Sequence, residues 1–240
     1  MDQFSSLIEG YKAFRNGTYR QNVERYRALG ETDQQPKALI IACCDSRADP
    51  AMIFSSDPGE LFVVRNVANL VPPYQPDEHY HGTSAAIEFA IEGLNIKDVI
   101  VMGHARCGGI KALYESQHGN PPKGEFVSGW MSMAQGVAEH VHEHHADLDA
   151  AKQIRMMEMR GVVSSLDQLR TFPFIRQRET EGRLRLHGCF YGIATGVLPL
   201  PHSTKFPTAT EVCCYLMSAL TIKSLAIASG HYAHAQHTFR

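Results

Sequence analysis

Continuous apolar runs of strand length recur along the first half of the chain. Residues 37–43, 61–65 and 98–103 are such runs. Runs that do not alternate with polar residues are typical of parallel strands that are covered by helices on both faces. Between the second and the third run, residues 83–94 repeat apolar side chains at helical spacing. The order strand, helix, strand predicts a βαβ unit, and therefore an α/β fold with a mostly parallel central sheet flanked by helices.

The segments around this unit predict further helices and one more strand. Residues 1–35 carry scattered apolar side chains at the spacing of an amphipathic helix, which predicts an N-terminal helical arm that docks on a body or a partner. Residues 125–170 are expected to be largely helical. Residues 184–193 alternate enough to be a strand, which we expect at a sheet edge and in antiparallel orientation. The apolar run in residues 201–240 predicts a helix that packs on the body or on a neighbouring subunit.

Composition and charge narrow the classes of function. The chain has 240 residues, and 23 basic against 25 acidic side chains give a net charge of −2. This balance gives no reason to expect nucleic acid as a partner, and association with a membrane is not expected either. The N-terminus lacks the apolar stretch of a signal peptide. Six cysteines that include two adjacent pairs do not form the pattern of a disulfide framework, so we expect a cytoplasmic protein with reduced thiols.

Two segments with candidate chemistry follow directly on two of the predicted strands. Residues 43–47 read Cys-Cys-Asp-Ser-Arg, and residues 103–109 read Gly-His-Ala-Arg-Cys-Gly-Gly. Because sites in open α/β sheets form outside the carboxyl ends of strands, we expect the two segments to face each other. Taken singly, a histidine or a cysteine near a strand is more often a structural residue than a ligand. Their combination at two strand ends favours a site.

The residue types in these two segments suit one zinc ion. Cys43, His104 and Cys107 offer two thiolates and an imidazole, and three protein ligands with one open position are typical of a catalytic zinc site. Asp45 is either a fourth ligand or a hydrogen-bond acceptor beside the metal. Arg47 can hold that carboxylate in a bidentate pair. We therefore predict about one Zn²⁺ per chain.

Together with residues 65–69, which read Arg-Asn-Val-Ala-Asn, these motifs resemble those of the β-class carbonic anhydrases in order, spacing and flanks. Residues 58–73 are similar to the plant-type branch in particular, and the resemblance covers roughly residues 30–200. It implies the reversible hydration of carbon dioxide to bicarbonate and a proton, with the three zinc ligands named above. It also implies a catalytic dyad of Asp45 and Arg47, in which the arginine keeps the aspartate turned away from the zinc.

The same resemblance implies how the substrate is bound. Gln34, Phe62 and Phe89 match residues that shape the pocket for carbon dioxide and bicarbonate, which the family builds across a dimer interface. Phe89 stands where tyrosine is usual, so one hydroxyl is lost from the pocket. Val67 would add to the apolar seat for the gas, and the backbone N–H of Gly108 would bind an oxygen of nascent bicarbonate. We therefore expect a homodimer or a higher even-numbered homo-oligomer.

Other functions compete with carbon dioxide hydration. One is hydrolysis of a related small molecule such as carbon disulfide or carbonyl sulfide, because the pocket alone decides between these substrates. Another is a non-catalytic zinc-binding protein on the same scaffold, although a structural site has no use for a carboxylate held beside the metal. A zinc deaminase lacks support, because the chain has no Cys-x-x-Cys motif. We expect a single catalytic domain over residues 1–240, divided into the helical arm, a zinc enzyme core and a tail with no assigned role: residues 1–35, 36–200 and 201–240.

Overall fold

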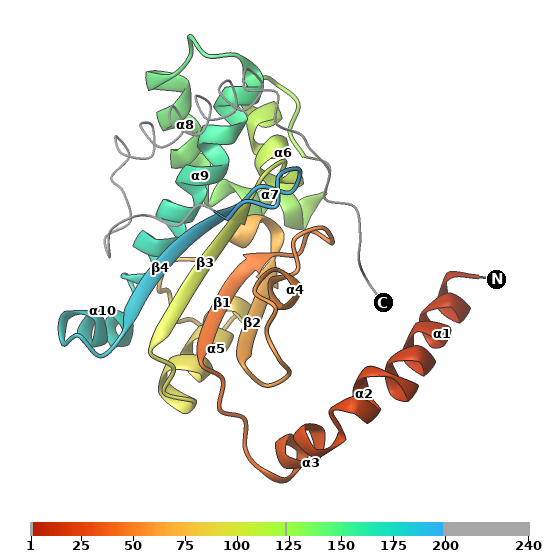
Figure 1. Ribbon diagram of the computed structural model, residues 1–240. Helices are drawn as coiled ribbons and strands as arrows, with labels where there is room; N and C mark the ends of the chain where they lie inside the picture. The colour runs from red at the N-terminus through yellow and green to blue at the C-terminus, as the bar shows by residue number, and fades with distance from the viewer. Residues whose placement is uncertain (1, 123, 199–240) are drawn as a thin grey trace, which may run out of the picture.

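Four parallel strands form the sheet at the centre of the computed structural model, which describes residues 2–122 and 124–198 (Figure 1). The strands lie in the order β2-β1-β3-β4. Their bounds are Ala38–Cys43 for β1, Leu61–Asn66 for β2, Asp98–His104 for β3 and Arg185–Tyr191 for β4. The structure confirms the predicted fold class, a parallel sheet flanked by helices with a helical N-terminal arm.

The direction predicted for the last strand is wrong. β4 lies at the sheet edge of the described residues as expected, but it pairs with β3 in parallel, from Asp98 opposite Arg185 to His104 opposite Tyr191. The long helix α9 (Ala150–Leu169) and the short helix α10 (Pro173–Thr180) carry the chain back along the sheet before β4 begins. A helical crossover of this kind returns the chain in the direction of the previous strand.

The N-terminal arm is a row of helices that runs away from the sheet (Figure 1). It consists of α1 (Gln3–Asn16), α2 (Thr18–Gln21) and α3 (Val23–Glu31). Asp2 begins the arm, because its carboxylate accepts a hydrogen bond of 2.8 Å from the backbone N–H of Ser5 and so caps α1. None of the three helices has a buried residue within the described chain.

The predicted helices between the strands are present, with local differences. The segment 83–94 begins as α5 (Gly82–Glu88) and ends in a π-helical turn, η2 (Phe89–Gly93). The segment 125–170 divides into α7 (Glu125–Ser132), α8 (Gln135–His144) and α9. The remaining elements are α4 (Pro50–Ile53), the 3₁₀ turn η1 (Val67–Asn69) and α6 (Gly108–Gln117). Within the described residues, no helix is both long and apolar enough to cross a membrane. The helix predicted for residues 201–240 lies outside the described residues.

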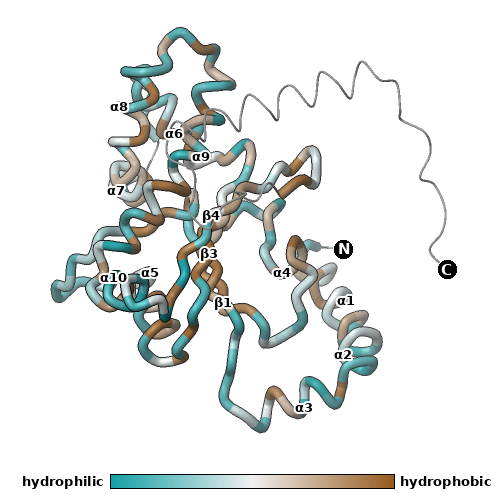
Figure 2. The backbone as a smooth tube through the Cα atoms, turned by 60° about the vertical axis from the view of Figure 1, so that its left-hand side comes forward, coloured by the Kyte–Doolittle hydropathy of each residue, from teal (hydrophilic) through white to brown (hydrophobic). Residues whose placement is uncertain are grey.

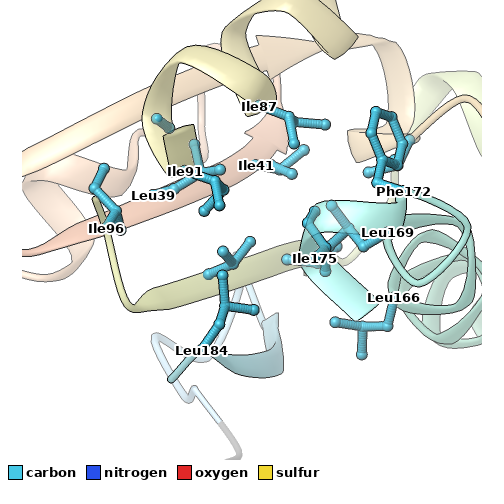
Figure 3. Packing of buried hydrophobic residues seen from close by; sticks show 14 of the residues in the cluster. Leu39, Ile41, Ile87, Ile91, Ile96, Leu166, Leu169, Phe172, Ile175 and Leu184 are labelled. Carbon is cyan, nitrogen blue, oxygen red and sulfur yellow. The ribbon is translucent and has the colours of Figure 1, made fainter. Parts of the chain in front are cut away.

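The main core lies between the sheet and the helices α5, α9 and α10 (Figure 3). Leu39 and Ile41 of β1 point into it, whereas Ile40 and Ala42 point to the opposite face of the sheet. All four side chains are fully buried, which explains the unbroken apolar run that predicted this strand. Burial of each Leu or Ile side chain contributes about 1.5–3 kcal/mol to stability. Figure 2 shows the same concentration of hydrophobic residues along the strands.

A second core closes the carboxyl end of the sheet. The helices α6, α7, α8 and α9 gather there and bury a cluster of apolar side chains. The cluster contains Cys43 from the end of β1 and Cys107 from the turn before α6. The candidate metal ligands are therefore built into an apolar core and do not lie on a surface loop.

A glycine in β3 provides a test of how tightly this end of the sheet is packed. A Cβ atom on Gly103 would lie 2.5 Å from Cγ2 of Val162 on α9. We predict that Gly103→Ala lowers the free energy of unfolding by about 1–3 kcal/mol through overpacking. Thermal unfolding at fixed chain concentration measures the loss, and adding Val162→Ala should recover part of it. The control is Gly136→Ala, where a Cβ meets nothing within 4 Å. An equal loss in both single variants would contradict the packing argument.

Candidate metal centre

The predicted metal ligands meet at the carboxyl end of two neighbouring strands. Cys43 is the last residue of β1 and His104 the last residue of β3, and the two strands pair in parallel up to Ala42 opposite Met102. Cys107 follows three residues after His104, at the N-terminus of α6. One ligand atom from each of the three residues lies within 4.8 Å of the others, and all three residues are buried. No other cluster of this kind occurs among the described residues.

The donor geometry fits a tetrahedral zinc ion. The two sulfur atoms of Cys43 and Cys107 are 4.0 Å apart, close to the roughly 3.8 Å that two Zn–S bonds of 2.3 Å span at a tetrahedral angle. Nδ1 of His104 donates to the carbonyl of Ala105 at 2.9 Å, which leaves the lone pair of Nε2 free. Nε2 is buried and has no hydrogen-bond partner in the described structure. A buried nitrogen without a partner is costly, and a metal ion satisfies it.

The two thiols are poised to lose their protons to a metal. A hydrogen bond from Cys107 lowers the pKa of Cys43 to about 4. The pKa of Cys107 is raised, because its thiol is hydrogen-bonded to the Cys43 sulfur and because it is buried. The two sulfur atoms therefore share a hydrogen bond across 4.0 Å. A divalent cation held by both sulfur atoms would take the place of this hydrogen bond, since thiolates are the form that binds zinc.

Asp45 and Arg47 form a bidentate pair beside the ligands. Nε of Arg47 donates to Oδ1 of Asp45 at 2.9 Å, and Nη2 donates to Oδ2 at 2.7 Å. Nη2 also contacts the carbonyl oxygen of Arg106 at 3.2 Å, which joins the two ligand-bearing loops. The guanidinium holds the pKa of Asp45 well below its usual range, so this carboxylate is ionised at physiological pH. Asp45 and Arg47 thus form an ion pair beside the candidate ligands, and their catalytic role stays a prediction.

Arg65 has a structural role at the site that the sequence analysis missed. From β2 it donates to the carbonyl oxygen of Cys43 at 3.0 Å, to that of Asp45 at 2.7 Å and to the Asp49 carboxylate at 2.9 Å. These bonds hold the loop that carries the first ligand and the dyad. Its position in the family-like motif at residues 65–69 was the available signal, but bonds to main-chain oxygens leave no trace in a sequence.

Glu158 on α9 is the second residue that the sequence analysis missed. It is 4% exposed, and its Oε1 accepts a hydrogen bond of 2.9 Å from the backbone N–H of Cys107. Oε2 lies 3.2 Å from Nη1 of Arg155, which compensates the buried charge. Burial raises the pKa of Glu158. A glutamate between Met157 and Met159, on a helix with an apolar face, was the only hint in the sequence.

The predicted pocket residues divide into two groups. Val67 and Gly108 lie next to the ligands, because η1 contacts Cys43 and α6 begins directly after Cys107. Gln34, Phe62 and Phe89 lie elsewhere. Phe62 pairs with Leu39, four residues before Cys43 along β1, which corresponds to about 13 Å along the strand. Its ring centroid is 6.0 Å from that of Phe89, and Phe89 and Gln34 line a cavity of about 560 Å³ beside the end of the arm.

Comparison with known proteins agrees with this site. A family model described as carbonic anhydrase matches residues 38–198. Beta carbonic anhydrase 3 of Arabidopsis thaliana is 34% identical over 201 residues, which cover 83% of this chain and 77% of the relative. A solved structure of the β-carbonic anhydrase CcaA is 33% identical, with a TM-score of 0.75 over 82% of this chain and 94% of that one. A tetrameric β-carbonic anhydrase from Sordaria macrospora is 26% identical, with a TM-score of 0.74 over 85% and 98% of the two chains.

The fold and the site therefore define a zinc enzyme of the α/β class. More specifically, the chain belongs to the β-class carbonic anhydrases, in the plant-type branch. It is an enzyme of reversible carbon dioxide hydration, and zinc is its metal.

The ligand set can be tested by substitution. We predict that Cys107→Ala loses both bound zinc and hydration activity, because two remaining ligands do not complete the site. Metal content by mass spectrometry and activity on the same sample measure both losses. The control is Cys189→Ala: this thiol is also buried, which raises its pKa to about 12, but it packs with Ile40, Ala42 and Met102 and is not part of the ligand cluster. Full zinc occupancy in Cys107→Ala would remove this residue from the ligand set.

Proposed function

We propose that the reversible hydration of carbon dioxide takes place at a single zinc ion held by Cys43, His104 and Cys107, with Asp45 as the acceptor that orients the nucleophile. When bound there, zinc lowers the pKa of a water molecule from 15.7 to about 7 and so provides a nucleophile at neutral pH. The observation that carries the proposal is the bidentate Asp45–Arg47 pair, which lies beside the three candidate ligands. A structural zinc site has no need of a carboxylate held in this way.

Asp45 acts through its charge and its fixed orientation. Oδ1 accepts two hydrogen bonds from Arg47, from Nε and from the backbone N–H, whereas Oδ2 accepts one. A carboxylate oxygen can accept two hydrogen bonds, so Oδ2 keeps a lone pair for the proton of the attacking water. Arg47 also prevents the carboxylate from turning toward the ligands. A zinc ion held by the three ligands would then keep its fourth position open for chemistry.

The wall of the site binds the other reactant and the product. Val67 provides an apolar surface for carbon dioxide, which carries no charge. Gly108 begins α6, and the free N–H groups at a helix N-terminus favour an anion such as bicarbonate. We propose that the N–H of Gly108 donates a hydrogen bond to an oxygen of bicarbonate. No Cβ on this residue obstructs approach to its backbone.

We also propose that the active form is an even-numbered homo-oligomer in which one chain completes the pocket of its neighbour. Phe62 lies opposite Leu39, about 13 Å along the sheet from the position opposite Cys43. Phe62 and its neighbours Gln34 and Phe89 are therefore too distant to line the metal site of their own chain. The structure from Sordaria macrospora is described as a tetramer, which supports assembly of this kind. The arm offers a surface for it.

The exposed side of α1 is the surface that we assign to this contact. Phe4, Leu7 and Tyr11 are 72%, 71% and 58% exposed, and they follow one another at helical spacing. An isolated helix of this length is marginal in water, so it is stabilised by covering its apolar face. Gln34 follows α3, the last helix of the arm, and we propose that the copy contacted by the arm also lies beside this pocket residue. The arm and the pocket thus have one common explanation.

The function itself is tested by stopped-flow hydration of carbon dioxide with a pH indicator, on protein of measured zinc content. We expect turnover that scales with zinc occupancy and disappears after removal of the metal with a chelator. Carbon disulfide is offered to the same sample as the competing substrate. A fully zinc-loaded protein that hydrolyses carbon disulfide but leaves carbon dioxide unchanged would overturn the proposal, and inactivity toward both would favour a binding role.

Removal of Arg47 tests the dyad. We predict that Arg47→Ala keeps about one zinc per chain but loses hydration activity by about 10- to 100-fold, because the freed Asp45 carboxylate competes for the open position on the metal. Arg47→Lys should recover little, since an ammonium group cannot form the bidentate pair. Zinc content, activity and a crystal structure of Arg47→Ala measure the effect. Wild-type turnover in this variant would show that Arg47 does not restrain Asp45.

A charge on the apolar side of α1 tests the assembly. We predict that Leu7→Asp weakens association and lowers specific activity at low chain concentration, because a charged side chain is then buried in the contact. Ser6→Asp is the matched control: it adds the same charge at the neighbouring exposed position. Sedimentation velocity over a dilution series compares the two. Unchanged association in Leu7→Asp, or a fully active monomer of the unaltered chain, would contradict the proposed role of the arm.

A further inference from the structure

The backbone next to Cys43 has an unusual conformation. At the end of β2 the chain turns through η1, and Ala68 and Asn69 both have positive φ angles, of 63° and 49°. Non-glycine residues seldom adopt this left-handed conformation, and two in succession persist only where the surroundings impose them. We call residues 67–69 the corner. Such strain often accompanies function, which raises the question of what the corner positions.

Three helices far away in the sequence hold the corner in place. Nε1 of Trp130 on α7 donates to the carbonyl oxygen of Val67 at 2.8 Å. Oγ of Ser165 on α9 donates to the carbonyl oxygen of Asn69 at 3.0 Å. Gly109 on α6 leaves the space that the corner occupies, since a Cβ there would lie 2.8 Å from Cγ1 of Val67 and 3.1 Å from Cβ of Ala68. The surroundings thus hold the peptide groups at the two ends of the corner, Val67–Ala68 and Asn69–Leu70.

The result of this arrangement is a backbone N–H aimed at a metal ligand. The nitrogen of Ala68 lies 3.4 Å from Sγ of Cys43 and donates a hydrogen bond to it. Both residues are buried, with exposures of 1% and 5%, so water does not compete for the sulfur. In a buried environment such a bond is electrostatically stronger than in water.

A thiolate with a hydrogen bond is a weaker electron donor than one without. Two thiolates place more negative charge on zinc than neutral imidazoles do, which works against activation of water. An N–H dipole aimed at one sulfur withdraws part of that charge, as partners of metal ligands generally tune the metal. The corner therefore has an electronic consequence as well as a geometric one.

We infer that Trp130 and Ser165 are positioning residues that hold the Ala68 N–H on the Cys43 sulfur and thereby lower the charge that this ligand donates to the metal. The inference deepens the proposed function and rests on Cys43 as a zinc ligand. It assigns a role to Trp130, the single tryptophan of the chain, and to a fully buried serine that the catalytic cycle does not touch. It also explains why the strained corner lies directly beside the site.

The test uses two variants, each of which removes one hydrogen bond to the corner, and one matched control. Trp130→Phe keeps an aromatic ring but removes the Nε1 donor, and Ser165→Ala removes the Oγ donor with little change in shape. Ser164→Ala is the control: it makes the same change one residue earlier on α9, where no hydrogen bond of its side chain is present in the described structure. All three are prepared with cobalt(II) in place of zinc, and separately with zinc.

The main measurement is the near-ultraviolet charge-transfer band from thiolate to cobalt(II), which does not depend on turnover. A thiolate that loses its hydrogen bond gives up an electron more easily, so the band of Trp130→Phe and Ser165→Ala should move to longer wavelength while that of Ser164→Ala stays in place. In the zinc forms, the rate of zinc loss to a chelator should change by about tenfold in the two corner variants. Hydration activity should fall at unchanged zinc content.

The outcomes separate this inference from the proposed function. If both corner variants have the wild-type charge-transfer band, the corner does not act on the Cys43 sulfur and the inference is wrong, even where activity falls. If the band shifts in Ser164→Ala as well, the effect comes from general loosening of α9 and the inference is again wrong. A shifted band in a chain whose unaltered form does not hydrate carbon dioxide would support the inference and reject the proposed activity.

Discussion

The parallel pairing of β1 with β3 is the constraint on which the whole site depends. It brings Cys43 and His104 to the same edge of the sheet, although 60 residues lie between them in the chain. Central strands are covered on both faces, so the ligands emerge from a rigid and apolar support. A slip of one residue in this register would turn every side chain of one strand to the opposite face and would displace its ligand relative to the other. The apolar side chains of β1 therefore fix the metal geometry as well as the fold.

Charged side chains secure the loops that this pairing brings together. Arg65 donates to the main-chain oxygens of the first ligand, Cys43, and of Asp45, and Glu158 accepts from the N–H of Cys107. Arg47 joins the two loops through its contacts with Asp45 and with the Arg106 carbonyl. Bonds from charged groups are the stronger ones in proteins, and here they replace regular secondary structure. The loops can thus be irregular in conformation and still hold their ligands in fixed positions.

How much the sequence predicted depends on the range of the interaction. The strands were found because an apolar run is a local property, and the ligands because their types and spacing limit the chemistry. The direction of β4 was predicted incorrectly, because alternation of residues 184–193 reports exposure and says nothing of the path by which α9 and α10 return the chain. Glu158 and Trp130 were missed since both act on backbone atoms of distant segments.

The sequence by itself was sufficient to predict the class of fold, the three candidate ligands and the Asp45–Arg47 pair. Each of these predictions depends on short apolar runs or on short motifs. Only the tertiary structure decided which distant groups support them and where the pocket residues lie. Phe62 and Val67 are five positions apart in sequence, but an extended strand of that length separates them by more than about 10 Å. Val67 therefore lies at the site and Phe62 does not. Proximity in space follows from sheet register and crossover path, which depend on all the elements together.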